Sequence, residues 1–178
     1  MTNEIIISGF GGQGVMAIGK NLAEAGMKEN KNVSWLPSYG PEMRGGTANC
    51  SVVLSDEPII CPIVLEPTEL IAMNLPSLVK FEPTVVKDGV VFVNSSIISD
   101  KVQRSDVRAV YVPCLEIANE LGNLKVANMV MLGAYIEVMK NLGTETIKEM
   151  LVHIFTGPKA KLVDLNVEAL RRGAACVK

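Results

Sequence analysis

The sequence predicts an α/β fold, a layered and Rossmann-like sheet that is mostly parallel and flanked by helices. Short apolar runs alternate along the chain with segments whose apolar residues recur at helical spacing, which is the order of βαβ units. The runs are hydrophobic throughout rather than alternating, as in strands that are buried on both faces. The 178 residues suffice for one domain with a sizeable core, so we expect a single domain over residues 1–178.

The expected strands begin with residues 5–8, a short apolar run directly before a cluster of glycines. Residues 32–36 form the second strand, which Pro37 is expected to end because proline cannot donate a hydrogen bond to a sheet. The apolar stretch "EPIICPIV", residues 57–64, is interpreted as a possible antiparallel arm. The full set of expected strands is residues 5–8, 32–36, 47–55, 69–74, 88–94 and 107–114.

Helices are expected wherever apolar residues recur every three or four positions, as Val15, Ile18 and Leu22 do. The segment 126–140 is rich in methionine and small residues, and core packing explains its apolar side chains. The expected helices are residues 13–30, a short piece around 77–81, then 115–121, 126–140, 144–155 and 163–172.

Composition and charge exclude several functions. The net charge is −2 without a basic run, so nucleic acid is not an expected partner. No apolar run approaches the roughly 20 residues of a membrane helix, and the start does not resemble a signal peptide, so we expect a cytoplasmic protein without a membrane partner. The cysteines contain no C-x-x-C pair, so no metal or iron–sulfur site is expected within the chain, and they are expected to be reduced core residues: Cys50, Cys61, Cys114 and Cys176.

The stretch "IIISGFGGQGV" contains the pattern G-x-G-x-x-G between an expected strand and an expected helix. In that context a helix N-terminus can face a phosphate or another anion. An NAD site would also need an acidic residue at the end of the second strand, and this sequence has none there. An ATP or GTP site would need G-K-[ST] after the glycines, and that motif is also missing. Three interpretations stay open: close packing of helix on strand, anion binding and, without that acidic residue, NAD binding. The anion-binding candidates are Gly9, Gly11, Gly12, Gln13 and Gly14.

A second loop, "SYGPEMRGG", contains a rigid proline and flexible glycines on either side of two charged residues, and it also carries a tyrosine. It follows the second strand, at the sheet edge where α/β proteins bind ligands and partners, so we expect it near the first loop. The alternative is that Glu42 and Arg44 only pair with each other on the surface. The candidates for an interface or an active-site approach are Tyr39, Pro41, Glu42, Arg44, Gly45, Gly46 and, from the later helix, Asn128.

The chain contains no nucleophile–histidine pair and no clustered carboxylates, so no catalytic residue is expected and it is a poor candidate for a complete enzyme. The sequence is better explained if this chain is one part of a larger assembly.

Four stretches in this order resemble the gamma subunits of 2-oxoacid:ferredoxin oxidoreductases: "ISGFGGQGV", "PSYGPEMRGGTANC", "NMVMLGAYIE" and "LVDLNVEALRRG". The resemblance spans nearly the whole chain. It is nearest to the 2-oxoglutarate type, and pyruvate and branched-chain relatives share the same domain.

The resemblance implies a subunit of an oxidoreductase that converts a 2-oxoacid and coenzyme A to an acyl-CoA and CO₂ while reducing ferredoxin. Thiamine pyrophosphate, Mg and iron–sulfur clusters would lie on partner subunits, namely alpha, beta and a ferredoxin-like delta subunit. This chain would complete the assembly near the active site, and alone it would be inactive. Its glycine loop would face an anion such as a phosphate of coenzyme A. The alternative is a stand-alone nucleotide- or anion-binding regulatory module that uses the loop 9–14.

Overall fold

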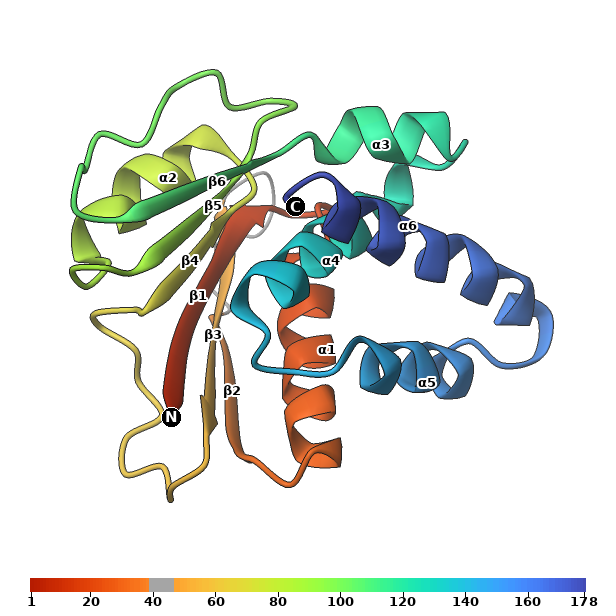
Figure 1. Ribbon diagram of the computed structural model, residues 1–178, viewed down its shortest axis with the longest axis horizontal. Coiled ribbons are helices and arrows are strands. Elements are labelled where there is room, and N and C mark those ends of the chain that lie inside the picture. The colour runs from red at the N-terminus through yellow and green to blue at the C-terminus, as the bar shows by residue number, and fades with distance from the viewer. Residues whose placement is uncertain (39–46) are drawn as a thin grey trace.

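The computed structural model describes residues 1–38 and 47–178, which form a six-stranded sheet with helices on both faces (Figure 1). The strand order is β2-β3-β1-β4-β5-β6. The strands are β1 (Thr2–Phe10), β2 (Asn32–Ser38), β3 (Thr47–Ser55), β4 (Glu69–Ala72), β5 (Val90–Asn94) and β6 (Arg108–Val112). The helices are α1 (Val15–Lys28), α2 (Leu75–Phe81), α3 (Cys114–Glu120), α4 (Ala127–Met139), α5 (Thr144–Ile154) and α6 (Val163–Ala175).

The predicted fold class is confirmed, because β1, β4, β5 and β6 are mutually parallel and helices flank them. Of the six strands described, only β3 is reversed, and it pairs antiparallel with β1 on one side and with β2 on the other. Apart from the possible arm at residues 57–64, every expected strand and helix is present, with bounds that differ by a few residues.

Two details of the expected strands were wrong. The predicted antiparallel arm at residues 57–64 contains no strand, since Pro58 and Pro62 remove backbone donors from it. The antiparallel element is β3 itself, inside the sheet. Strand β2 also continues through Pro37 to Ser38, because it lies at the sheet edge, where a missing N–H costs little.

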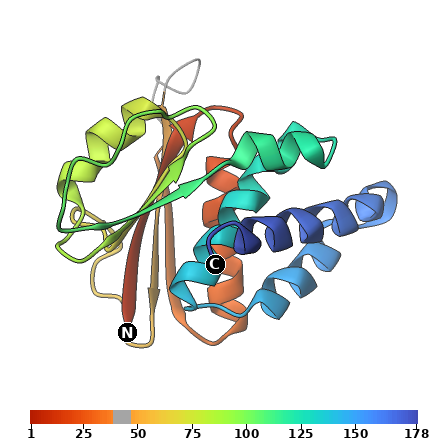
Figure 2. The same ribbon diagram turned by 45° about the horizontal axis from the view of Figure 1, so that its top comes forward.

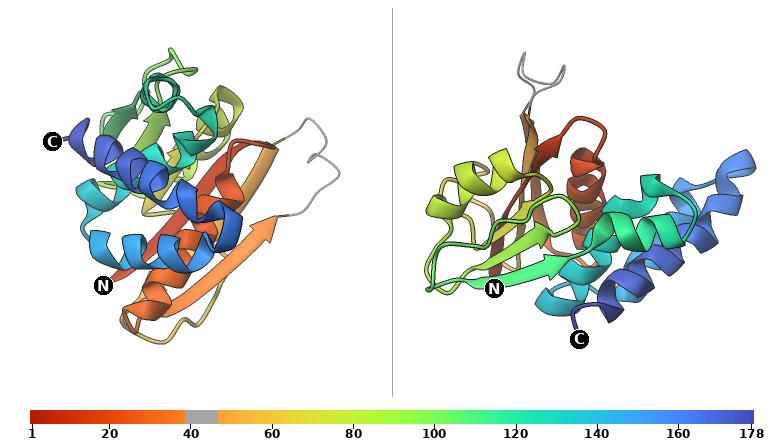
Figure 3. Two further views of the ribbon diagram at one scale, coloured as in Figure 1. Left: turned by 90° about the vertical axis from the view of Figure 1, so that its right-hand side faces the viewer. Right: turned by 90° about the horizontal axis from the view of Figure 1, so that it is seen from above.

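The two faces of the sheet carry unequal cover (Figure 2). Side chains of α1, α3, α4, α5 and α6 pack with one face in the larger core, whereas α2 packs on the opposite face in the smaller core. The division follows the alternation along β1, where Ile5 and Ile7 point to the larger core and Ile6 to the smaller one. Helices α5 and α6 lie farther from the strands than α1 does (Figure 3).

Helix α4 is apolar around most of its circumference because α6 covers the side that does not face the sheet. On the sheet side, the Tyr135 ring packs 5.4 Å from the Phe92 ring. On the other side the backbones of α4 and α6 touch at Gly133 and Gly173. The core role predicted for this helix is confirmed, since its apolar residues are buried: Met129, Val130, Leu132, Ala134 and Ile136.

Candidate functional site

The chain leaves neighbouring strands β1 and β4 toward opposite faces of the sheet. After β1 it enters α1 on the larger-core face, and after β4 it enters α2 on the other face (Figure 1). A crevice outside the carboxyl ends of two such strands is the usual ligand site of open α/β sheets. The loop 9–14 lies on one side of this switch point, and residues 73–74 lie on the other.

The glycines of the loop have separate structural reasons. Gly12 and Gly14 have φ values of 91° and 75°, which side chains rarely adopt, and Gly14 is the N-cap of α1. A Cβ at Gly9 would lie 2.7 Å from the Cβ of Met73, so glycine is needed for close packing there. Gly11 is exposed. Among the described residues no side chain caps α1, and the first turn of this helix contains no acidic residue.

Gln13 ties the two sides of the switch point together. Its Nε2 donates to the Met73 carbonyl oxygen at 3.0 Å, and its Oε1 accepts from the Phe10 N–H at 2.7 Å. The carboxamide of this predicted anion-binding residue is therefore used inside the loop, where it holds the end of β1 against the end of β4.

A Gln13→Glu variant is expected to lose about 1–2 kcal/mol in its free energy of unfolding, because a carboxylate cannot donate to the Met73 carbonyl. Urea unfolding at pH 7 measures this loss. Gln103→Glu is the matched control, since Gln103 Nε2 donates to the Lys101 carbonyl at 2.7 Å on the exposed surface. Equal losses in the two variants would contradict a special role for Gln13.

Two buried asparagines complete this edge and were missed from the sequence. Asn74 and Asn94, each 1% exposed, follow β4 and end β5. Asn74 Oδ1 accepts from the Ser77 N–H at 2.9 Å and caps α2, while Asn94 Nδ2 donates to the Met73 carbonyl at 3.4 Å. The Nδ2 of Asn74 and the Oδ1 of Asn94 have no partner among the described residues. The available signal was that the runs "ELIAMN" and "VVFVN" both end in asparagine.

Asn128, at the start of α4, is brought to the glycine loop. A Cβ on Gly14 would lie 2.7 Å from the Cβ of Asn128, so the two backbones can approach only because position 14 is glycine. Asn128 Oδ1 accepts from the Met129 N–H at 3.0 Å. This candidate residue of the interface or active-site approach therefore lies beside the glycine loop.

The other predicted residues lie outside the described residues: Tyr39, Pro41, Glu42, Arg44, Gly45 and Gly46. The residues that flank them are placed. Thr47 pairs with Phe10 at the end of β1, and Ser38 pairs with Asn49 nearby. Both flanks therefore lie at the sheet edge that carries the glycine loop.

The cysteines are dispersed. Cys50 and Cys114 are buried, as expected, but Cys61 and Cys176 are exposed, so the prediction of four core thiols was half wrong. Burial raises the pKa of the Cys50 thiol to about 11 and also raises the pKa of Cys114, so both stay protonated and make poor metal ligands. Within residues 1–38 and 47–178, no three histidine, cysteine or acidic side chains are grouped to hold a metal ion.

None of the helices described is long and apolar enough to cross a membrane.

The family model described as "Pyruvate ferredoxin/flavodoxin oxidoreductase" matches residues 4–176. The ketoisovalerate oxidoreductase subunit VorA of Methanothermobacter thermautotrophicus is 42% identical over 94% of this chain and 35% of its own length. The 2-oxoglutarate synthase subunit KorC of Methanocaldococcus jannaschii is 37% identical over 85% of this chain and 83% of its own. This chain thus spans about a third of the VorA relative but most of the KorC relative. Relatives of both kinds match, so similarity does not single out 2-oxoglutarate.

Solved structures agree with the fold. The gamma subunit of a keto/oxoacid ferredoxin oxidoreductase from Geobacter sulfurreducens has a TM-score of 0.82 at 28% identity, covering 97% of this chain and 96% of that one. A 2-oxoglutarate:ferredoxin oxidoreductase from Magnetococcus marinus, solved with 2-oxoglutarate, coenzyme A and succinyl-CoA bound, has a TM-score of 0.88 at 23% identity. The match covers 99% of this chain and 32% of that one, and it shows a shared fold. The chain belongs to the pyruvate ferredoxin/flavodoxin oxidoreductase family, as its resemblance to gamma subunits predicted.

Proposed function

We propose that this chain is the gamma subunit of a thiamine pyrophosphate-dependent 2-oxoacid:ferredoxin oxidoreductase of the cytoplasm. The carrying observation is the family match over residues 4–176, together with the likeness to a separate gamma subunit over nearly both chains. The switch-point edge offers backbone N–H groups and carboxamides, which bind and position but do not by themselves break bonds. The subunit therefore completes the assembly, and other chains carry the chemistry.

The cofactors of the reaction belong on the partner subunits in this proposal. An iron–sulfur cluster is typically held by about four cysteine thiolates brought together. Here two of the thiols are buried and protonated, and the described residues form no ligand group. Alpha and beta subunits would hold thiamine pyrophosphate and Mg, and a ferredoxin-like delta subunit would pass electrons to ferredoxin.

The glycine loop is proposed to face an anionic group, such as a phosphate of coenzyme A. Its support is the positive φ of Gly12 and Gly14, which turns the backbone ahead of α1. In the part of the chain that the structure describes, α1 also has no capping side chain, and its first turn has no acidic residue. The Magnetococcus marinus structure of the same fold contains coenzyme A and succinyl-CoA. The segment 39–46 would line the neighbouring subunit interface or the approach to the active site.

A Gly12→Asp variant in the reconstituted complex is expected to raise the KM for coenzyme A at least tenfold, because a carboxylate in the loop would repel a phosphate. Gly122→Asp is a matched control. Gly122 has a φ of 77°, Gly12 one of 91°, and a Cβ at either position meets nothing within 4 Å. The two variants therefore carry similar backbone strain. An unchanged KM for coenzyme A in Gly12→Asp would remove the anion-binding part of the proposal.

The assembly itself is tested by co-expressing the chain with candidate alpha, beta and delta subunits. The expected result is a complex that reduces viologen with a 2-oxoacid and coenzyme A, assayed across 2-oxoglutarate, pyruvate and branched-chain 2-oxoacids. The alternative, a stand-alone nucleotide- or anion-binding regulatory module, predicts that the isolated chain binds NAD, FAD or ATP by calorimetry and does not co-purify with these subunits.

A further inference from the structure

We propose that a cleft between α1, α4, α5 and the start of α6, here named the asparagine cleft, binds a small aliphatic carboxylate. The cleft has a volume of about 360 Å³. It lies beside the glycine loop, since Asn128 belongs to its lining and also abuts Gly14. The side chains that matter for binding are Lys20, Asn21, Asn123, Lys125, Asn128 and Met129.

The wall of the cleft contains apolar side chains from several elements. Val126, Met129 and Leu151 are buried members of the larger core that also line the cleft, and Phe155 packs against that core. Such a surface accepts an aliphatic body but offers it no hydrogen bond. Orientation of a ligand must therefore come from the polar side chains.

Those polar side chains present hydrogen-bond donors. Asn123 Oδ1 accepts from the Lys125 N–H at 3.0 Å, and Asn128 Oδ1 accepts from the Met129 N–H at 3.0 Å. These bonds fix which end of each carboxamide is the oxygen. The NH₂ group of Asn123 is therefore the end that it offers to a ligand, whereas Asn128 Nδ2 packs against Gly14, whose added Cβ would lie 2.7 Å from it. Asn21 is 6% exposed, and its Nδ2 lies 4.0 Å from Met129 Sδ, a weak acceptor. The cleft therefore suits an acceptor.

The charges of the lining favour an anion. Lys20 and Lys125 line the cleft, and the lining includes no acidic side chain among the residues described. The ion pair of Lys20 with Glu24 is 3.4 Å long, and its lysine is 60% exposed, so solvent screens it and it competes weakly with a ligand. Donors, two ammonium groups and an apolar wall together match a carboxylate with a short hydrocarbon body.

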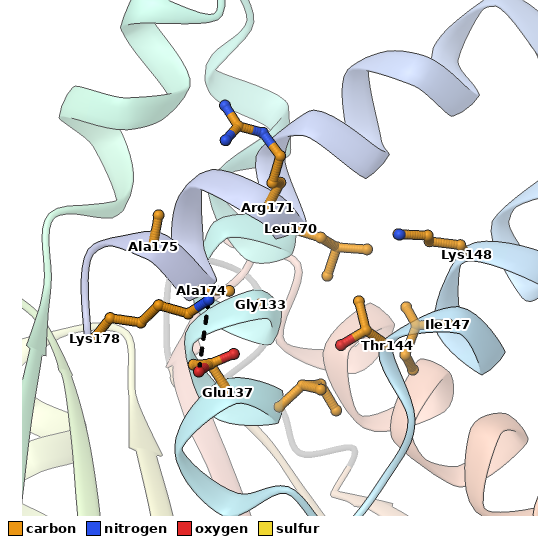
Figure 4. Close-up of a pocket in the computed structure, with 11 residues that line it drawn as sticks. Gly133, Glu137, Thr144, Ile147, Lys148, Leu170, Arg171, Ala174, Ala175 and Lys178 are labelled. Carbon is orange, nitrogen blue, oxygen red and sulfur yellow. Dashed lines mark ion pairs between the residues drawn. The ribbon is translucent and has the colours of Figure 1, made fainter.

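A second cleft provides a comparison in which basic side chains are accompanied by carboxylates. It lies between α4, α5 and α6, has a volume of about 250 Å³ and is lined by three basic side chains (Figure 4). Each of the three has a carboxylate partner: Lys148 with Glu145 at 2.6 Å, Arg171 with Glu168 at 2.6 Å, and Lys178 with Glu137 at 3.9 Å. One of these carboxylates, Glu137, itself lines the second cleft, whereas the asparagine cleft has no acidic lining residue among those described, so the second cleft serves as the control. The proposal does not depend on the proposed enzyme function.

The test is calorimetry on the full chain with isovalerate as the probe. Binding is expected to saturate with a Kd on the order of 1 mM, the strength expected of so small a ligand. The neutral analogue 3-methyl-1-butanol and inorganic phosphate, which lacks an apolar body, are each expected to bind at least tenfold more weakly. Absence of saturable isovalerate binding at tens of millimolar, or equal binding of phosphate, would overturn the proposal.

Two variants locate the site. Lys125→Glu and Asn21→Leu are each expected to weaken isovalerate binding at least tenfold, whereas Lys148→Glu in the second cleft is expected to leave the Kd unchanged. Lys125 is exposed, so its replacement keeps the test decisive even if the buried Asn21 proves necessary for folding. Unaltered binding in Lys125→Glu, or an equal loss in Lys148→Glu, would contradict the assignment to this cleft.

Discussion

A Gly173→Ala variant is expected to lose about 3 kcal/mol or more in its free energy of unfolding. The added Cβ would overlap the carbonyl oxygen of Val130 and lie 2.7 Å from the carbonyl carbon of the same residue. Both atoms belong to the backbone of α4, so no side-chain rotation can relieve the overlap and the two helices must separate. In an open helix the same change would stabilise by about 1 kcal/mol, so the sign of the effect reports the contact.

Urea unfolding of the purified chain measures this effect. Ala175→Leu is the control, because it adds bulk at an exposed position of the same helix and is expected to change stability by about 0.5 kcal/mol at most. Gly133→Ala is expected to behave like Gly173→Ala, since its Cβ would overlap the backbone of Leu170. One separation of α4 from α6 relieves both overlaps, so the double variant should lose less than the sum. A stabilising Gly173→Ala would show that the helices do not touch there.

A Glu69→Gln variant is expected to remove a large pH dependence of stability. Glu69 is 2% exposed at the start of β4, and burial raises its pKa from 4.5 to about 7 despite a 2.8 Å hydrogen bond from Asn3 Nδ2. A group with a raised folded-state pKa stabilises fully below its unfolded pKa and loses that contribution as pH rises through its folded pKa. The wild-type free energy of unfolding should therefore fall relative to the variant by about 3 kcal/mol between pH 4.5 and pH 8.

Denaturant unfolding of both proteins at several pH values measures the difference. Subtracting the variant removes the opposite contributions of carboxylates such as Asp56, whose pKa is lowered to about 2 by Lys31 and the terminal amine. Glu66→Gln is the control, because Glu66 is an exposed carboxylate on the connection just before β4. A wild-type minus Glu69→Gln difference that stays flat from pH 4.5 to 8 would show that Glu69 is not desolvated.

The local elements of this fold were predictable because each is encoded in a short window. The apolar runs at residues 5–8 and 88–94 became β1 and β5, and the helical spacing after Gly14 became α1. Errors came where partners distant in sequence decide the outcome. Pro37 belongs to β2 only because that strand lies at the edge, and the edge position is a property of the whole sheet.

The candidate site was predictable in part. The glycine loop was identified because a turn before a helix needs residues with positive φ, which is a local demand. Asn74 and Asn94 were missed, because in the sequence each is only a polar residue after an apolar run. They come together at one edge of the sheet only because β4 and β5 lie side by side. The contact between Asn128 and Gly14 likewise depends on how the start of α4 packs against the start of α1.

The sequence by itself determined which segments form helices and strands, where the glycine loop lies and which family the chain belongs to. It could do so because the hydrophobic period, the positions of the glycines and the order of the motifs are all local properties of the sequence. Only the tertiary structure decided that β3 runs reversed between β2 and β1, that Gln13 joins β1 to β4, and that Gly133 and Gly173 bring two helices into backbone contact. These features depend on side chains and backbones meeting across long separations in sequence. That depends on the packing of the whole core, which no local pattern specifies.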